Sequence, residues 1–284
     1  MKAKSVYEVR AHLVDTWVAK ELANPQDPWI IEDFFPRAGF TIIAGRPKLS
    51  YKTWWALLAA SCMASGRDSG PFKVREQCNV LYIDKEASAH QAALRFRLLE
   101  AGGSGIAAED TRGFHYMQGH PFLLTSGEHI AALCKYVAGH EIKYVFIDTF
   151  SRSFMGNEND AGDVMKSLSA FEHLRTLGCG MCLVHHSNKA GYNQAGHRLD
   201  PDGTLRGSSA MAGAYESILS IQEARVEGQH RQYLIRGGKY VTHEAYEVKW
   251  TTKKNKIAKL TWTGPMDLPE ADGVAPRPEK TSMF

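Results

Sequence analysis

The sequence lacks long hydrophobic runs, and it carries little net charge. Apolar stretches such as 57–60 and 144–147 are far too short to cross a bilayer, and the first residues contain no apolar signal-peptide segment. We therefore expect a cytoplasmic protein that does not engage membranes. The net charge is +3 over 284 residues, so any contact with nucleic acid requires a local basic patch.

Cysteines are too few and too scattered for a disulfide framework. They occupy positions 62, 78, 134, 179 and 182, mostly in apolar surroundings, which is typical of reduced, buried thiols. Cys179 and Cys182 have the C-x-x-C spacing and two histidines follow them, so zinc or redox chemistry is an alternative. The segment 179–184 is predicted to be a strand, whose alternation would separate the two thiols. Buried strand cysteines are the favoured interpretation.

Hydrophobic periodicity predicts an amphipathic helix over 5–23, broken by the Pro-containing segment 24–28. Such a helix could pack on its own domain or on a neighbouring subunit. From residue 40, short apolar runs alternate with helical patterns, which predicts an α/β fold with a mostly parallel central sheet flanked by helices. The predicted strands are 40–44, 79–84, 114–117, 143–148 and 179–184, and the predicted helices are 52–65, 88–101, 127–138 and 160–176.

The pattern changes after residue 186. A polar, Gly-rich stretch, 187–202, is the best candidate for a mobile loop. Antiparallel strands at one sheet edge toward the C-terminus are then predicted at 215–222, 231–236, 246–250 and 257–262. Prolines from Pro265 onward predict a disordered tail. We expect an N-terminal helix and linker (1–28), one α/β domain (29–263) and a tail (264–284).

The most informative motif lies between the first predicted strand and helix of the α/β domain. Residues 40–53 read FTIIAGRPKLSYKT, the layout of a phosphate-binding P-loop. In such a loop, backbone N–H groups and the helix N-terminus hold the β-phosphate, Lys52 reaches the β/γ oxygens, and the Thr53 hydroxyl binds Mg²⁺. The candidate nucleotide-binding residues are Gly45, Arg46, Pro47, Lys48, Leu49, Ser50, Tyr51, Lys52, Thr53 and Trp54.

This loop departs from the usual G-x-x-x-x-G-K-[ST] pattern. Lys52 lies seven positions after Gly45, one more than usual, and Tyr51 stands where the second glycine is expected. That glycine normally lets the backbone approach phosphate closely, so we expect the loop to take another path. Taken alone, the stretch could also be an ordinary Gly/Pro turn between a strand and a helix.

Polar residues follow three other predicted strands, at the edge where open parallel sheets bind ligands. Asp148 ends an apolar strand, which is a Walker B pattern for Mg²⁺. Glu86, just past a strand expected next to the P-loop strand, is the candidate general base, with Asp84 as its rival. His185 and His186 end the strand expected beside Asp148, where a polar side chain can touch the γ-phosphate. Each residue alone could instead be a cap or a solvated charge.

A further candidate follows the polar loop. Arg206 lies among hydroxyl residues in the segment 204–210, where it could bind a phosphate of a nucleic-acid strand or of a neighbour's nucleotide. A simple helix start is the alternative, because serine is a favoured N-cap.

In this order, the motifs resemble the RecA-like ATPases of the RepA type, which are hexameric replicative helicases of plasmids and phages. The likeness runs from about Trp29 to Trp250 and rests on AGRPK, SYKTW, YIDKE, IDTFSR, VHHSNK and RGSS. It implies a RecA-like P-loop NTPase core over 29–263, with ATP and Mg²⁺ as cofactors. It also implies a homo-oligomeric ring acting on single-stranded DNA, with other replication or recombination proteins as possible partners.

The resemblance further implies roles for matching residues. Lys52 and Thr53 take the Walker A roles, Asp148 the Walker B role, Glu86 that of catalytic base, and His186 that of γ-phosphate switch. A basic residue from the adjacent subunit completes the site by stabilising charge on the transferred phosphoryl group. The candidates are Arg206, Arg236 and Lys239.

The loop 187–205 would face the channel of the ring and contact DNA. Its candidate nucleic-acid residues, with one just beyond it, are Asn188, Lys189, His197, Arg198 and Arg206. Two other functions stay open. A RecA-like recombination or repair ATPase, or a DNA-dependent switch, would keep the site without unwinding DNA. A degenerate, non-hydrolysing DNA-binding module would explain the altered P-loop, although the intact Lys52, Thr53, Glu86 and Asp148 argue against it.

Overall fold

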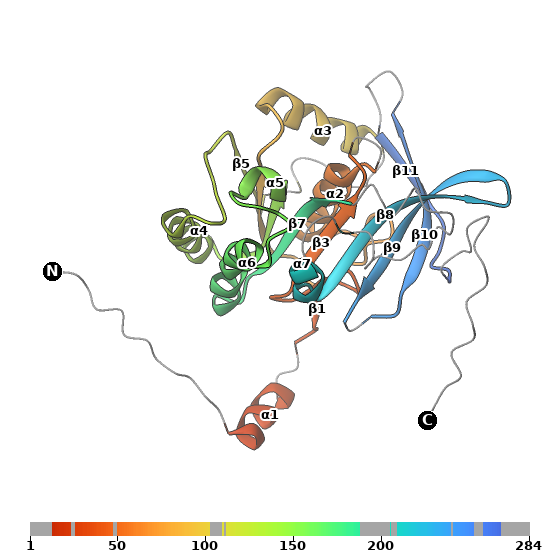
Figure 1. Ribbon diagram of the computed structural model, residues 1–284. Helices are drawn as coiled ribbons and strands as arrows, with labels where there is room; N and C mark the ends of the chain where they lie inside the picture. The colour runs from red at the N-terminus through yellow and green to blue at the C-terminus, as the bar shows by residue number, and fades with distance from the viewer. Residues whose placement is uncertain are drawn as a thin grey trace.

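A nine-stranded sheet forms the centre of the protein, in the order β11-β10-β9-β8-β3-β7-β6-β4-β5 (Figure 1). The computed structural model describes residues 13–23, 26–47, 50–102, 110, 112–187, 205, 209–239, 241–252 and 258–267. The strands of this sheet are β3 (Phe40–Gly45), β4 (Asn79–Asp84), β5 (Phe114–Gln118), β6 (Ile142–Asp148), β7 (Gly180–His186), β8 (Ser217–Val226), β9 (Gln229–Gly238), β10 (Glu244–Thr252) and β11 (Ala258–Trp262).

The strands from β8 to β5 are parallel, whereas β9, β10 and β11 add to the β8 edge in antiparallel pairs. The predicted α/β class, with antiparallel strands toward the C-terminus, is therefore confirmed. One strand differs from the prediction: β8 pairs in parallel with β3 and is antiparallel only to β9. The first six residues of β8 are all buried, which is typical of an interior parallel strand covered on both faces.

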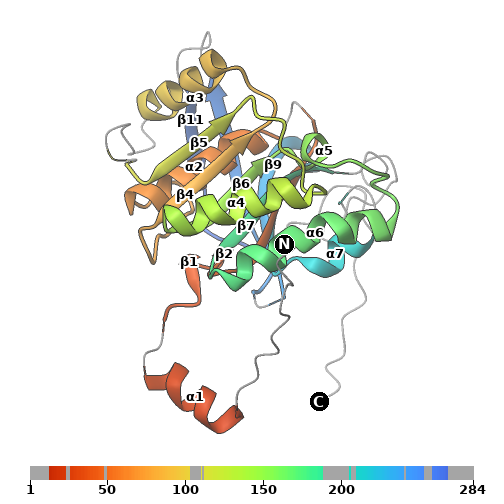
Figure 2. The same ribbon diagram turned by 90° about the vertical axis from the view of Figure 1, so that its left-hand side faces the viewer.

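Helices cover both faces of the sheet (Figures 1 and 2). The hydrophobic core is accordingly divided in two by the sheet. One layer contains α2 (Lys52–Ser65) and α3 (Ala89–Ala101), together with the short pair β1 (Trp29–Ile31) and β2 (Phe35–Pro36). The other layer contains α4 (Gly127–Gly139), α5 (Phe150–Ser153), α6 (Ala161–Thr176) and α7 (Ser209–Ala214). The elements β1, β2 and α5 were not predicted, because two to four residues are too short for a periodic pattern.

Helix α2, which follows the P-loop segment, is enclosed by the protein. Every residue from Trp55 to Ala64 is buried, and the helix is apolar all round, as expected for a helix without a solvent face. Its last turn is closed by Gly66 in the left-handed conformation, whose N–H donates to the Cys62 carbonyl. The P-loop therefore leads into an element that is fixed by packing along its length.

Helix α1 (Val14–Ala23) stands apart from this body (Figures 1 and 2). The predicted helix covers 5–23, but residues 1–12 lie outside the described part. Three apolar side chains remain largely exposed: Leu13 (76%), Val14 (73%) and Leu22 (72%). These three side chains are therefore not buried on the chain's own domain, one of the two arrangements considered for the helix, whereas the other arrangement, packing on a neighbouring subunit, stays a prediction.

Other features of the fold test smaller predictions. All five cysteines are free thiols. Cys179 packs in the α6 layer and Cys182 in the α2 layer, so the C-x-x-C pair faces both sides of the sheet, as predicted. The chain stays on the sheet beyond the predicted domain end, because Met266 pairs with Ala245. No helix in the described part of the chain combines the length and the apolar character needed to cross a membrane.

Gly180 is required where β7 passes Tyr144. A Cβ at this position would lie 2.4 Å from the Tyr144 ring and 3.0 Å from the Gly39 carbonyl oxygen. Gly180→Ala should therefore lower the free energy of unfolding by about 1–3 kcal/mol, as overpacking does. Gly127→Ala is the matched control, because a Cβ at that helical position meets nothing within 4 Å. Urea unfolding measures both variants, and equal stabilities would contradict the packing argument.

Candidate functional site

The predicted site residues lie at one edge of the sheet, because β3, β7, β6 and β4 are neighbouring parallel strands. At this carboxyl edge, Gly45 is paired with His186, and Asp84 is paired with Asp148. We predicted that the strand before Glu86 lies beside the P-loop strand. This prediction is wrong, because β7 and β6 lie between β3 and β4. The Walker B strand β6, rather than β3, is the neighbour of β4.

The P-loop folds back on itself between β3 and α2. A Cβ on Gly45 would lie 2.6 Å from Ser50 Cβ and Oγ, and Ser50 Oγ donates a hydrogen bond to the Arg46 carbonyl (2.7 Å). Tyr51 has φ 54° and ψ 30°, the left-handed conformation that glycine adopts most easily. Residue 51 therefore has the backbone conformation typical of the usual glycine, although it is a tyrosine. Lys48 and Leu49 lie outside the described residues.

Several contacts hold the P-loop residues around Tyr51 in place. The Tyr51 carbonyl accepts hydrogen bonds from the N–H groups of Trp54 and Trp55, which begins α2. The Tyr51 side chain packs against the core, and Trp54 lies against Trp250, with ring centroids 5.8 Å apart. Tertiary packing thus holds a conformation that costs a tyrosine about 1–3 kcal/mol. Arg46 and Pro47 lie at the start of the loop, half-buried and exposed respectively.

Lys52 points into the loop rather than into solvent. Its ammonium group donates to the carbonyls of Gly45 (2.8 Å) and Arg46 (3.0 Å) and to Ser50 Oγ (3.2 Å). Burial lowers the pKa of Lys52 to about 8, against the opposing effect of Asp148 and Glu86. The group therefore remains mainly a cation at neutral pH, held against the backbone that would surround a phosphate.

Asp148 is almost completely buried at the end of β6. The Tyr82 hydroxyl donates to Asp148 Oδ2 (2.8 Å), and the nearby Thr53 hydroxyl, like that of Tyr82, opposes a rise in the pKa of this carboxylate. Burial raises the pKa of Asp148 to about 6, and Asp84 and Glu86 act in the same direction. Asp148 Oδ1 is buried without a hydrogen-bond partner among the described residues. The following peptide bond, to Thr149, is cis.

This arrangement fits Mg²⁺. A partnerless carboxylate oxygen beside a threonine hydroxyl offers the hard oxygen ligands that Mg²⁺ prefers. Among the described residues, no group of three or more His, Cys, Asp and Glu side chains could hold a metal ion alone. Mg²⁺ typically keeps several waters and shares phosphate oxygens, so one carboxylate and one hydroxyl are sufficient protein ligands.

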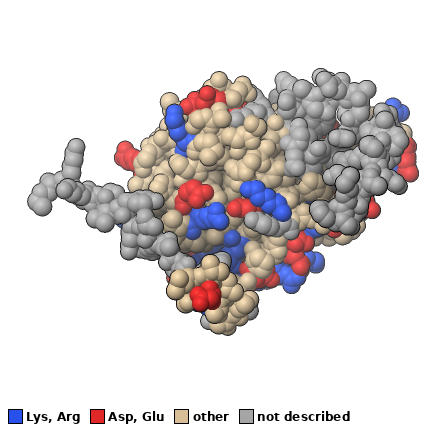
Figure 3. Space-filling model, turned by 60° about the horizontal axis from the view of Figure 1, so that its bottom comes forward, with Lys and Arg blue, Asp and Glu red and all other residues tan. Residues whose placement is uncertain are grey.

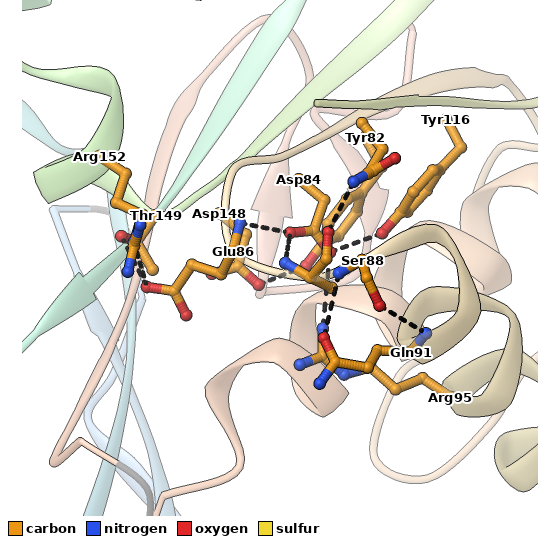
Figure 4. A network of polar contacts seen from close by, with 12 residues as sticks. Tyr82, Asp84, Glu86, Ser88, Gln91, Arg95, Tyr116, Asp148, Thr149 and Arg152 are labelled. Carbon is orange, nitrogen blue, oxygen red and sulfur yellow. Dashed lines mark hydrogen bonds and ion pairs between the residues drawn. The ribbon is translucent and has the colours of Figure 1, made fainter. Parts of the chain in front are cut away.

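The two rival carboxylates at the end of β4 and in the turn after it have different surroundings (Figure 4). Asp84 is buried, and its Oδ1 accepts from the N–H groups of Glu86 and Ala87 (2.8 Å each). Its Oδ2 accepts from the Tyr116 hydroxyl (2.5 Å) and lies 3.5 Å from Arg95. Asp84 thus shapes the turn after β4 and has no oxygen left for a water.

Glu86 is exposed by 36% and lies nearer the surface of the site. Its Oε1 accepts from the Thr149 hydroxyl (3.3 Å) and lies 3.7 Å from Arg152 Nε (Figure 4). Its other oxygen can reach a water, which is the requirement for a general base. The geometry therefore favours Glu86 over Asp84.

The two histidines of β7 face opposite sides of the sheet, as alternation requires. His185 is buried in the α6 layer, where its ring lies edge-on to Phe150 of α5 with ring centroids 5.2 Å apart. His186 is half-buried and lies on the α2 side, in register with Gly45 of the P-loop. Of the pair, His186 is the residue on the side of the phosphate loop, and its role as γ-phosphate switch stays a prediction.

Residues 7–192 match the family described as AAA domain. The match spans more than half of the chain. The chain belongs to this family of P-loop ATPases. No curated protein matches the sequence. The AAA domain thus includes the P-loop, Glu86, Asp148 and His186, and it makes the chain a nucleotide-binding ATPase.

The three basic candidates lie beyond the matched AAA-domain residues, and of the two that the structure describes, one is exposed. Arg236 is buried, with Asp33 Oδ2 at 2.6 Å and Glu244 Oε2 at 2.8 Å. It also lies over the Phe34 ring, 5.6 Å from the centroid. Because two carboxylates hold its guanidinium, its surroundings contradict its prediction as the residue acting across a subunit boundary and support a structural role.

Lys239 is exposed and donates to the Gly213 carbonyl (3.1 Å). It follows Gly238, which is paired with Ser217, and Ser217 is paired with Thr41 at the start of β3. Lys239 therefore lies at the opposite end of the sheet from the P-loop of its own AAA domain. Arg206 and the predicted DNA contacts Asn188, Lys189, His197 and Arg198 lie outside the described residues.

Sequence reasoning missed several residues that hold the AAA-domain site. Tyr82, Tyr116, Thr149 and Arg152 bond to its carboxylates, and none was a candidate. The sequence pattern could have indicated Tyr82. It lies two residues before the candidate Asp84, and residues two apart on a strand share a face of the sheet. Tyr116 lacked such a signal, because it depends on β5 pairing with β4.

Two other surfaces bear on ligand binding. A cavity of about 520 Å³ lies between β5 and α4, and its lining includes Leu81, Met117 and Leu133 but no P-loop residue. Figure 3 shows one face of the molecule, where the described basic side chains are interspersed with acidic ones. The local basic patch expected for DNA is therefore not found among the described residues of this face.

Tyr51 provides a test of the unusual P-loop. Tyr51→Gly should keep nucleotide affinity, because glycine adopts the left-handed conformation freely. Tyr51→Val should weaken it by about tenfold or more, since a β-branched residue is a strong outlier there. Titration with a fluorescent ATP analogue compares the two variants. Equal affinities would show that the backbone conformation at residue 51 does not govern phosphate binding.

Asp148 predicts a pH-dependent effect on stability without nucleotide or Mg²⁺. Its folded pKa of about 6 exceeds the unfolded value of 3.8, so its charge destabilises the fold fully above pH 6. The penalty disappears as pH falls from 6 toward 3.8, because the folded state binds the proton first. Asp148→Asn should thus raise the unfolding free energy by about 1–3 kcal/mol at pH 7.5 and much less at pH 4.

Urea unfolding at both pH values measures this difference. Glu100→Gln, on the exposed end of α3, controls for loss of a carboxylate charge outside the site. A destabilised Asp148→Asn variant at pH 7.5 would show that the carboxylate is better stabilised than its burial indicates.

Proposed function

We propose that this chain is a Mg²⁺-ATP-driven motor on single-stranded DNA, acting as a ring-forming replicative helicase of a phage or plasmid. The AAA domain supports the ATPase part of this proposal, and the family occurs in phage and plasmid helicase-like proteins. The single observation that carries it is the meeting of Lys52, Asp148, Glu86 and His186 at one sheet edge.

Each of these residues would have a separate role in phosphoryl transfer to water. Lys52 would exchange its loop acceptors for β- and γ-phosphate oxygens, and backbone N–H groups at the start of α2 would hold the β-phosphate. Thr53 and Asp148 would hold Mg²⁺, which supplies charge stabilisation to the phosphates. The site is thus built for charge stabilisation and positioning.

Glu86 is the proposed general base. The turn fixed by Asp84 orients its backbone, and Thr149 and Arg152 hold one carboxylate oxygen. The remaining oxygen would accept a proton from the attacking water. His186 lies beside the P-loop and directly precedes the channel loop 187–205, so it would link the γ-phosphate to DNA contacts.

Two features support assembly into a homo-oligomer. The exposed apolar residues of α1 need a surface that the chain's own body does not provide. Lys239, at the end of the sheet away from its own P-loop, would complete the site of a neighbour by stabilising charge on the transferred phosphoryl group. The modest net charge is compatible with a ring, which needs positive charge only along its channel.

Steady-state ATP hydrolysis with Mg²⁺, with and without single-stranded DNA, tests the proposal on protein sized by light scattering. We expect DNA-stimulated hydrolysis by a ring-sized oligomer, lost in Lys52→Ala, and strand displacement on a forked duplex. DNA-stimulated hydrolysis without strand displacement would replace the helicase by a recombination ATPase or DNA-dependent switch. No hydrolysis under any condition would leave a non-hydrolysing binding module.

Glu86→Gln separates binding from chemistry. It should bind ATP normally but hydrolyse it about 10²–10⁴-fold more slowly, the usual contribution of a general base. Glu100→Gln is the matched control and should behave like the unsubstituted protein, because it lies on the exposed end of α3. Single-turnover hydrolysis together with nucleotide titration gives both quantities. Unchanged hydrolysis in Glu86→Gln would remove this residue from the role of base.

A further inference from the structure

Two tyrosine–carboxylate hydrogen bonds repeat across three neighbouring strands (Figure 4). Tyr82 on β4 donates to Asp148 on β6 (2.8 Å), and Tyr116 on β5 donates to Asp84 on β4 (2.5 Å). In the register, Tyr82 is paired with Phe146, and Tyr116 is paired with Tyr82. Each phenol therefore reaches the carboxylate two residues further along the neighbouring strand.

Stacking fixes the position of the inner hydroxyl. The Tyr82 ring lies between Tyr116 (centroids 5.6 Å apart, planes at 8°) and Phe146 (5.9 Å, 12°). The side chain of Tyr82 is fully buried, so its hydroxyl has one direction available. Phenylalanine would preserve this stack, which means that Tyr82→Phe removes little besides the hydrogen bond.

Each tyrosine hydroxyl donates to one carboxylate oxygen of its aspartate, and the other oxygen differs between the two aspartates. Tyr82 donates to Oδ2 of Asp148, and Oδ1 stays without a partner among the described residues. Tyr116 donates to Oδ2 of Asp84, and Oδ1 accepts the N–H groups that shape the turn at Glu86. One tyrosine therefore orients the proposed metal ligand, whereas the other supports the proposed base.

We propose that Tyr82 is a positioning residue for Mg²⁺, because it holds Oδ2 of Asp148 and leaves Oδ1 as the oxygen that would bind the cation. Tyr116 has a separate role, since through Asp84 it positions Glu86 for activation of the attacking water. This inference rests on the proposed function of the site as an ATPase centre, and it assigns the metal and the water to two different tyrosines.

Nucleotide binding measured with and without Mg²⁺ tests this division. The dissociation constant of a fluorescent ATP analogue is determined in excess Mg²⁺ and in excess EDTA for the unsubstituted protein, Tyr82→Phe and Tyr116→Phe. Tyr82→Phe should bind normally in EDTA but about fivefold to tenfold more weakly in Mg²⁺, as expected for the loss of one hydrogen bond to a charged ligand. The Mg²⁺ concentration for half-maximal binding should rise by a similar factor.

Tyr116→Phe is the matched control, because it loses the same group one strand away. It should keep both dissociation constants and lower the single-turnover rate instead. Thermal unfolding of both variants verifies that the stack is intact.

The outcomes separate the inference from the function on which it rests. Nucleotide affinity that does not respond to Mg²⁺ in the unsubstituted protein would overturn both. An Mg²⁺ response that is unchanged in Tyr82→Phe would overturn the positioning role alone. Equal weakening of Tyr82→Phe in Mg²⁺ and in EDTA would also overturn it, since that result indicates general damage to the loop.

Discussion

The burial of opposite charges at the end of a parallel sheet is the constraint on which this structure depends. Lys52 and Asp148 are both almost fully buried, and burial moves the pKa of each toward its neutral form. Each charge lowers the penalty of the other, and hydrogen bonds supply the rest of the compensation. Lys52 uses loop carbonyls, whereas Asp148 uses the hydroxyl of Tyr82.

These charges can be kept in place only by a rigid frame. Helix α2 provides one side of it, because its buried length fixes the backbone of Lys52 and Thr53. The stacked rings of Tyr116, Tyr82 and Phe146 provide the other, because they cross β5, β4 and β6, and the two tyrosine hydroxyls are aimed at carboxylates. Active sites commonly lower stability in this way, and the surrounding core compensates for it.

The sequence predicts the parts of the fold that depend on local pattern. The strands ending at Gly45, Asp148 and His186 are apolar runs buried on both faces, and each was located within two residues. Pairing partners are not local. The direction of β8, the strands between β3 and β4, and the role of Arg236 all depend on which elements meet in space. No spacing within 231–239 indicates that Asp33 and Glu244 will enclose that arginine.

The choice between Asp84 and Glu86 shows the same limit at the scale of one turn. The sequence places both near the carboxyl edge of the sheet, and either could serve as base. The choice follows from Tyr116, which reaches Asp84 only because β5 pairs with β4 in one register. A carboxylate with both oxygens bound has no position for a water, so the geometry favours Glu86 over Asp84 as the proposed base.

The two ends of the sheet bear on the proposed assembly of subunits. The carboxyl end contains the P-loop, Asp148 and Glu86, whereas Lys239 lies at the amino end, separated by the length of β3 and β8. No rotation of the Lys239 side chain can cross that distance within one subunit. If this cation stabilises the transferred phosphoryl group, it must do so in another subunit. If such a neighbour is present, the exposed apolar residues at α1 offer it a surface.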